Sequence, residues 1–95
     1  MTDTYPINPI DVDPVQTAHR TIRTQLPHPD SVATLNMLRR AEPVCMEGQP
    51  PIVWDHAEGA TVCDAYGNRW IDFSSGVLIT NAGHGREAMI QAIVR

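Results

Sequence analysis

The chain has 95 residues and a formal net charge of −4, so it is large enough for at most one small domain. Its few basic residues are scattered arginines, which disfavours nucleic-acid binding, and 42% apolar residues argue against wholesale disorder. No apolar run approaches the roughly 18 residues of a membrane span, and no secretory signal is visible. We therefore expect a cytoplasmic protein with free thiols, because Cys45 and Cys63 form no CxxC pair.

Residues 1–29 are predicted to form an extended, proline-rich N-terminal arm. All eight prolines of the chain lie within its first 51 residues. Proline fixes its own backbone and pushes the preceding residue towards β or polyproline geometry. No sustained helical or strand period is visible in this stretch. Such an arm either stays loose or lies across another surface.

Residues 30–41 are predicted to form a helix. Asp30 or Ser31 can cap its N-terminus by accepting a hydrogen bond from a backbone N–H of the first turn. The expected apolar stripe consists of Val32, Leu35 and Leu38, with Met37 nearby. Arginines occupy the last turn, where the helix dipole favours positive charge, and Pro43 ends the helix.

Residues 52–73 are predicted to form a short antiparallel β-meander. Its expected strands are 52–54, 61–63 and 69–73, joined by a turn-like segment at 57–59 and a hairpin connection at 64–68. Gly67 is free to take the positive φ that a tight connection needs. In the last strand, Trp70 and Asp72 alternate with Ile71 and Phe73 on opposite faces.

Residues 74–85 are predicted to be an ordered loop, and 86–95 a helix that the end of the sequence truncates. The loop contains three glycines and no clear period. The expected apolar side of the helix consists of Met89, Ile90, Ile93 and Val94. No stop signal follows, so we expect the chain to be an incomplete unit, a fragment of a longer protein.

No catalytic or metal-binding constellation is visible in the sequence. The four histidines have no metal-ligand spacing to one another or to a cysteine. Ser74-Ser75-Gly76 does not match the GxSxG nucleophile pattern, and no base can be assigned to it. Cys63 is interpreted as a packed side chain in a strand. The residues alone support a small α+β unit with no metal site and no catalytic residue of its own.

The segment from Gly59 onwards nevertheless resembles the opening of the class-III pyridoxal-phosphate-dependent aminotransferases, the group that includes 4-aminobutyrate and ornithine aminotransferases. In that family a glycine-containing hairpin leads to an Asp-Phe-x-Ser-Gly sequence, then to Asn-x-Gly-His and an amphipathic helix. The residues that carry the resemblance are Asp64, Gly67, Asp72-Phe73, Ser75-Gly76, Asn81 and Gly83-His84. It covers about residues 30–95 and is weaker before residue 50.

The resemblance implies that residues 30–95 are the incomplete N-terminal portion of the small domain of a fold-type I pyridoxal-phosphate transferase. The parent enzyme would transfer an amino group from an amine or ω-amino acid to a 2-oxo acid, as a homodimer. Val77 and Leu78 match positions that border the substrate, although both could instead simply fill the core. The family's cofactor-binding lysine lies far downstream, and this chain contains no lysine, so we expect it to be inactive alone.

Two alternatives stay open. A parent with the same fold could catalyse decarboxylation, racemisation or 1,2-amino migration, which nothing in this segment distinguishes. The chain could also be a free-standing interaction module. Within the aminotransferase interpretation, the position of Val77 tends to be aromatic in ornithine-type members. The absence of an aromatic residue at this position favours a 4-aminobutyrate-like or general ω-amino substrate.

Overall fold

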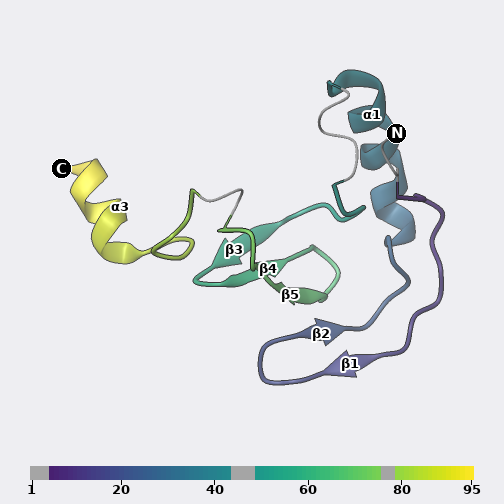
Figure 1. The fold of residues 1–95 in the computed structure, drawn as a ribbon, viewed down its shortest axis with the longest axis horizontal. Helices are drawn as coiled ribbons and strands as arrows, with labels where there is room; N and C mark the ends of the chain where they lie inside the picture. The colour runs from purple at the N-terminus through teal and green to yellow at the C-terminus, as the bar shows by residue number, and fades with distance from the viewer. Residues whose placement is uncertain (1–4, 44–48, 76–78) are drawn as a thin grey trace.

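In the computed structural model, the chain is described over residues 5–43, 49–75 and 79–95. These residues form an α+β structure with a five-stranded antiparallel sheet and two α-helices, one beyond each end of the sheet (Figure 1). The strands are β1 (Val15–Gln16), β2 (Thr21–Ile22), β3 (His56–Glu58), β4 (Thr61–Cys63) and β5 (Arg69–Ile71). The helices are α1 (Val32–Ala41) and α3 (Glu87–Val94), and a 3-10 turn, η1 (Pro29–Ser31), precedes α1. No helix among the described residues is long and apolar enough to cross a membrane.

The strand order in the sheet is β1-β2-β5-β4-β3. Consecutive strands β3, β4 and β5 are neighbours, which confirms the meander predicted within residues 52–73. Val62 of β4, the middle strand of the meander, pairs with Ala57 on one side and Trp70 on the other, and it is only 2% exposed. The turns on either side of β4 contain Gly59 and Gly67, both with positive φ, which glycine adopts without steric cost.

The first strand of the meander lies later in the chain than predicted. The sequence placed a strand at 52–54 and a turn at 57–59, but β3 spans His56–Glu58. Glu58 pairs directly with Thr61, so the turn is the two-residue Gly59-Ala60 connection. Because this tight turn fixes the register, the residues just before it must be the paired ones. The last strand is also shorter than predicted and ends at Ile71.

Residues 1–29, in which the sequence shows no strand period, nevertheless contain two short strands. Val15–Gln16 and Thr21–Ile22 form a hairpin, and Thr21 of this hairpin pairs with Arg69 of β5. Thr21 and Ile22 are 5% and 6% exposed. Each strand has only two residues, which is too short for a period-2 pattern to be recognised in the sequence. The prolines lie on either side of the hairpin, so each residue of its strands keeps a backbone N–H that can donate a hydrogen bond.

Helix α1 lies inside the predicted range, but the predicted cap is wrong. Ser31 makes no side-chain capping bond. His28 caps the η1 turn instead, with its Nδ1 atom accepting a hydrogen bond from the Asp30 backbone N–H at 3.1 Å. Of the predicted apolar stripe only Leu35 is buried, and Met37 and Leu38 are exposed. The helix contributes one anchoring side chain to the fold.

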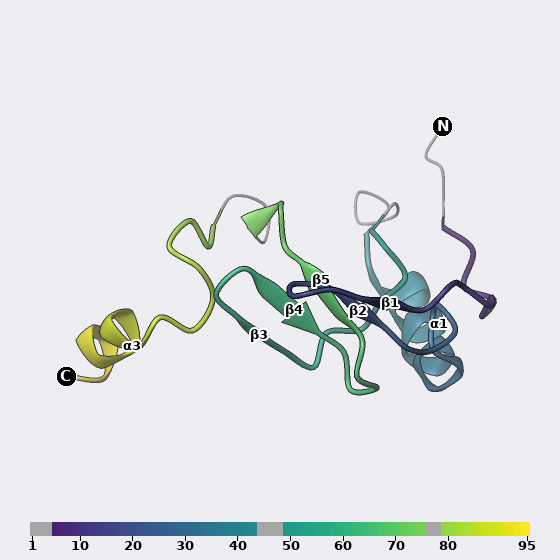
Figure 2. The ribbon, with the colours of Figure 1, turned by 90° about the horizontal axis from the view of Figure 1, so that it is seen from below.

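Helix α3 lies within the predicted range 86–95 and stands apart from the sheet in both views (Figures 1 and 2). None of its residues is buried. The predicted apolar side is fully formed but uncovered, with the four side chains Met89, Ile90, Ile93 and Val94 all exposed. The sheet and α1 therefore hold the described core, and the segment between β5 and α3 connects that core to an isolated helix.

Candidate functional site

The two sequence-predicted substrate residues, Val77 and Leu78, lie outside the described residues. The structure does describe the chain on both sides of them, from β5 to Ser75 and from Ile79 to α3. We call residues 72–84 the post-β5 loop. Its two ends contain the residues of the Asp-Phe-x-Ser-Gly and Asn-x-Gly-His resemblance, so its geometry is the relevant place to look for a functional site.

Asp72 follows directly after β5 and uses both of its carboxylate oxygens. Its Oδ1 atom accepts hydrogen bonds from the Ser74 backbone N–H at 3.1 Å and from the Ser74 hydroxyl at 2.9 Å. Its Oδ2 atom lies 2.7 Å from Nε2 of His84. The Asp72 backbone N–H donates to the Ala60 carbonyl at 2.8 Å. The Asp72 side chain thus bonds a backbone N–H just beyond the end of the strand.

His84 attaches the far end of the post-β5 loop to the β3–β4 turn. Its backbone N–H donates to the Gly59 carbonyl, and the Gly59 N–H donates back to the His84 carbonyl, both at 2.8 Å. The imidazole is held between Asp72 and Trp54, whose ring lies edge-on with centroids 5.6 Å apart. Only 14% of the His84 side chain and 4% of the Asp72 side chain are exposed.

The electrostatics of this pair favour an ionised carboxylate. The hydrogen bond from His84 is the main cause that lowers the pKa of Asp72 below its ordinary value, helped by the two Ser74 hydrogen bonds, while burial opposes them. A carboxylate can only accept, so Nε2 of His84 carries the proton of this hydrogen bond. The Ser74 hydroxyl donates to Asp72 and makes no hydrogen bond to His84. The three side chains therefore do not form a nucleophilic triad.

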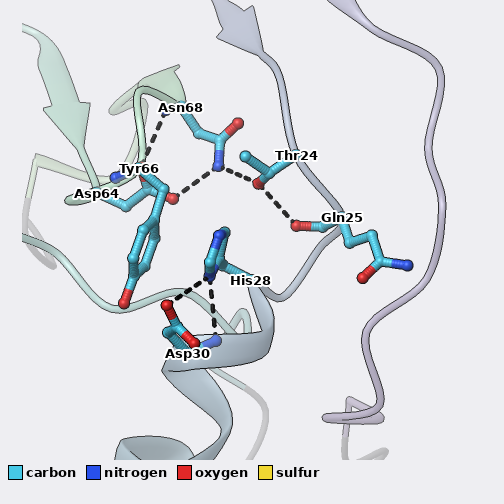
Figure 3. A network of polar contacts seen from close by, with 7 residues as sticks. All are labelled: Thr24, Gln25, His28, Asp30, Asp64, Tyr66 and Asn68. Atoms are coloured by element: carbon cyan, nitrogen blue, oxygen red, sulfur yellow. Dashed lines mark hydrogen bonds and ion pairs between the residues drawn. The ribbon is translucent and has the colours of Figure 1, made fainter.

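A second polar network joins the N-terminal hairpin to the β4–β5 turn (Figure 3). Its centre is Asn68, which is completely buried. The side-chain amide of Asn68 donates to Asp64 Oδ2 and to the Thr24 hydroxyl, both at 2.8 Å, and its Oδ1 atom accepts from the Arg23 backbone N–H at 2.8 Å. Asp64 Oδ1 also accepts from the backbone N–H groups of Tyr66 and Asn68. Every polar atom of the Asn68 side chain is satisfied within the protein, which makes this a structural network.

Beside this network, His28 and Tyr66 stack face to face. Their ring centroids lie 3.6 Å apart with an interplanar angle of 6°. Figure 3 shows His28 between Tyr66 and Asp30, with its Nδ1 atom directed at the start of η1. The stack therefore connects the β4–β5 turn to the helix that follows the N-terminal hairpin.

A largely apolar groove of about 750 Å³ lies next to Asp72. Apolar side chains of the N-terminal segment, of the segment before β3 and of the sheet line most of it, among them Ile10, Ile52 and Trp70. Asp72 and Ser74 of the post-β5 loop also line it, as do the polar residues Asn8 and Gln49.

The residues of this chain do not provide an attachment site for pyridoxal phosphate. Covalent attachment of this cofactor in enzymes uses a lysine amine, and all seven basic residues of the sequence are arginines. The described residues also contain no group of three or more histidine, cysteine or carboxylate side chains that could hold a metal ion. The arrangement at Asp72 can orient a loop and hold a proton, but it cannot supply cofactor chemistry.

Sequence reasoning noted both Asp72 and His84 but missed their pairing. The available signal was the separation of twelve residues between two polar positions that flank a glycine-containing loop. Two residues at this separation come into contact only if the loop between them brings its second end back to its first. The sequence also missed the role of Asn68, which was assigned to a hairpin connection alone.

Comparison with known proteins finds similarity over part of the chain. Over 67 residues, or 68% of the chain, the sequence is 36% identical to the acetylornithine aminotransferases of Mycobacterium bovis and Mycobacterium tuberculosis. It is 37% identical to the acetylornithine aminotransferase of Methanosarcina mazei over 46 residues, which are 48% of the chain and 12% of that protein. The chain thus has local similarity to aminotransferases.

A relative with a different printed name is also similar. The chain is 43% identical to an isoleucine 2-epimerase of Lentilactobacillus buchneri over 42 residues, which are 44% of the chain and 9% of that protein. The chain spans 17% of the length of the mycobacterial relatives that it matches. No protein-family model matches the chain, and no solved structure matches it.

Proposed function

We propose that this chain is the N-terminal segment of a class-III pyridoxal-phosphate-dependent aminotransferase, and that residues 30–95 form part of its small domain of fold-type I. The observation that carries this proposal is the 36% identity to acetylornithine aminotransferases over 68% of the chain. The family's sequence elements in their expected order, from Asp64 to Gly83-His84, also support it.

The complete enzyme transfers an amino group from an amine or ω-amino acid to a 2-oxo acid. Pyridoxal phosphate, when bound, supplies the electron sink for this chemistry. Residues outside this chain hold the cofactor, since the chain has no lysine. Within the chain, Val77 and Leu78 border the substrate and offer an apolar wall. The active enzyme is a cytoplasmic homodimer in which the N-terminal segment lies near the partner subunit.

The direct test uses the full-length protein loaded with pyridoxal phosphate. We expect glutamate to form from 2-oxoglutarate when acetylornithine, ornithine or 4-aminobutyrate is the amino donor. Separately, the 95-residue chain mixed with the cofactor should give no amino transfer and no enzyme-like absorbance band. Absence of amino transfer by the full-length protein with every donor would overturn the proposal.

A second candidate is racemisation or epimerisation by the same fold, and the similarity to an isoleucine 2-epimerase favours it over the other non-transferase reactions. The same preparation separates the two functions. An epimerase converts L-isoleucine into its 2-epimer without consuming a 2-oxo acid. Chiral chromatography of the products therefore decides between the two functions in one experiment.

A further inference from the structure

We propose that Cys63 is a modification site that forms a mixed disulfide with small disulfides bearing carboxylates, the class to which glutathione disulfide belongs. Cys63 lies in β4, and Arg23 and Arg69 line the same cavity and supply the charge that attracts the carboxylates. This reaction of Cys63 is independent of amino transfer and involves described residues only.

Cys63 belongs to a row of polar side chains on one face of the sheet. The strand register pairs Cys63 with His56 of β3 on one side and with Arg69 of β5 on the other. Arg69 in turn pairs with Thr21 of β2. Residues directly opposite each other in an antiparallel pair project from the same face, with Cβ atoms about 4.5–5.5 Å apart. The thiol therefore has an imidazole and a guanidinium as its two cross-strand neighbours.

A cavity of about 460 Å³ lies on this face, and all four residues of the row line it. Pockets that hold small organic ligands in proteins have volumes of roughly 300–1,000 Å³. Cys63 forms no disulfide and is half-buried, so its thiol is neither blocked by a covalent partner nor sealed in the core. Cys63 is therefore more than the packed side chain that its place in a strand predicts.

The two arginines at the cavity are not neutralised by ion pairs. Among the described residues, every contact between a basic side chain and a carboxylate within 4.0 Å involves a histidine. Arg69 donates one hydrogen bond to the Ala18 carbonyl at 3.0 Å, and its buried Nε atom has no described partner. Arg23 is exposed to solvent. Because a guanidinium does not lose its proton in proteins, both side chains keep a full positive charge at the cavity.

The two aspartates that line the cavity, in contrast, already have partners. Asp55 Oδ2 lies 2.8 Å from Nδ1 of His56. Asp64 is only 6% exposed. Its carboxylate accepts hydrogen bonds from the backbone N–H groups of Tyr66 and Asn68 and from the Asn68 amide. The uncommitted charge at the cavity is therefore positive, which favours a ligand that carries carboxylates.

The reaction is thiol–disulfide exchange. The Cys63 thiol releases its proton to solvent, and the thiolate attacks one sulfur of the small disulfide. A new S–S bond joins Cys63 to that half of the disulfide, while the original S–S bond breaks. The other half leaves as a thiolate and takes up a proton. Cys63 is thereby oxidised to the disulfide level and the leaving half is reduced to a thiol, so the small disulfide is the oxidant.

The test measures thiolation of Cys63 in the full-length protein by two disulfides of opposite charge. Glutathione disulfide has a net negative charge from its carboxylates, whereas cystamine carries only ammonium groups. All variants carry Cys45→Ser, so Cys63 is the one cysteine between Arg40 and Arg69. Trapping free thiols with iodoacetamide at timed intervals, followed by peptide mass spectrometry, gives a rate constant for each probe. Each value is divided by the rate constant for a neutral model thiol, N-acetylcysteine amide.

We expect the normalised rate constant for glutathione disulfide to exceed that for cystamine by about tenfold, although the chain has a net charge of −4. Arg69→Gln and Arg23→Gln should each lower this ratio by about fivefold, because each removes one charge contact with the ligand. Arg40→Gln is the matched control, since Arg40 is exposed on α1 and does not line the cavity. It should leave the ratio within about twofold of the wild type.

Absence of Cys63 thiolation by glutathione disulfide would overturn the proposal, because the complete protein would then cover this face of the sheet. An unchanged ratio in Arg23→Gln and Arg69→Gln would also overturn it. So would an equal decrease in Arg40→Gln, since the net charge and not the cavity would then set the preference. If Arg69→Gln does not fold, Arg23→Gln decides alone, because its exposed side chain can be replaced without disturbing the sheet.

Discussion

Two aspartates, Asp64 and Asp72, organise the two turns that flank β5, and they do so with the same local geometry. Each accepts at Oδ1 from the backbone N–H two residues further on, and each uses Oδ2 for a partner side chain. The partner of Asp64 is Asn68, which cannot titrate, and the partner of Asp72 is His84. In the turn before β5, the partner of the aspartate is therefore a side chain that cannot change its protonation state. In the turn after β5, both partners are ionisable.

The difference also extends to what each network connects. Asn68 also forms hydrogen bonds with Thr24 and Arg23, which precede it by 44 and 45 residues. It therefore joins the N-terminal hairpin to the meander. His84 lies 12 residues after Asp72 and closes a single loop. The first network is part of the core, whereas the second determines the position of one loop relative to that core. Three substitutions test this division.

The largest effect is expected for Asn68→Ala. This substitution removes donors from Asp64 and Thr24 and an acceptor from Arg23, all in or near the buried core, and should lower the free energy of unfolding by about 3 kcal/mol. The measurement is denaturant unfolding followed by circular dichroism. Asn36→Ala, at an exposed position of α1, is the matched control and should change the stability by less than about 0.5 kcal/mol. A loss below about 1 kcal/mol for Asn68→Ala would show that the network is not a core element.

An intermediate and pH-dependent effect is expected for Asp72→Asn. The hydrogen bonds to a charged acceptor that this substitution weakens are worth about 2 kcal/mol at neutral pH. The folded-state pKa of Asp72 lies below its unfolded value. The associated stability is therefore fully present above about pH 4 and is lost as the pH falls through the folded-state pKa.

Unfolding of the wild type and of Asp72→Asn at a series of pH values checks this sign. The two curves should differ most at neutral pH and converge only below the folded-state pKa of Asp72, where the carboxyl is protonated in both the folded and the unfolded states. If the difference grew with decreasing pH, the assignment of Asp72 as an ionised acceptor would be wrong.

The smallest effect is expected for Asp55→Asn. Nδ1 of His56 lies 2.8 Å from Oδ2 of Asp55, but both side chains are more than half exposed. Exposed pairs are screened by solvent and salt, so the free energy of unfolding should change by less than about 0.5 kcal/mol. A double-mutant cycle with His56→Gln measures the coupling. A coupling energy as large as that of Asp72 and His84 would mean that burial does not distinguish the two histidine pairs.

The sequence predicted those parts of the fold whose signals are local. Short-range periodicity and turn residues predict four elements. These are the middle strand of the meander at Thr61–Cys63, the hairpin connection at 64–68 and the helices near 30–41 and 86–95. The short strands at Val15–Gln16 and Thr21–Ile22 were missed, since pairing across the chain and not local propensity makes them strands.

The candidate site was predictable only as a set of separate residues. Asp72 and His84 both stood out in the resemblance, but their contact depends on the return of the loop to Gly59, which no pattern in the sequence specifies. The burial of Asn68 has the same origin, because its partners Arg23 and Thr24 lie more than forty residues away. Predictions for Val77 and Leu78 stay predictions, as these residues lie outside the described ranges.

The strand order has a consequence for biosynthesis. Because β2 pairs with both β1 and β5, it acquires its second neighbour only after Arg69 has left the ribosome. Until then β2 is unpaired on the side that later contacts β5. By the time Arg69 emerges, α1, β3 and β4 are already outside the exit tunnel. The nascent sheet therefore cannot be completed in the order in which it is translated.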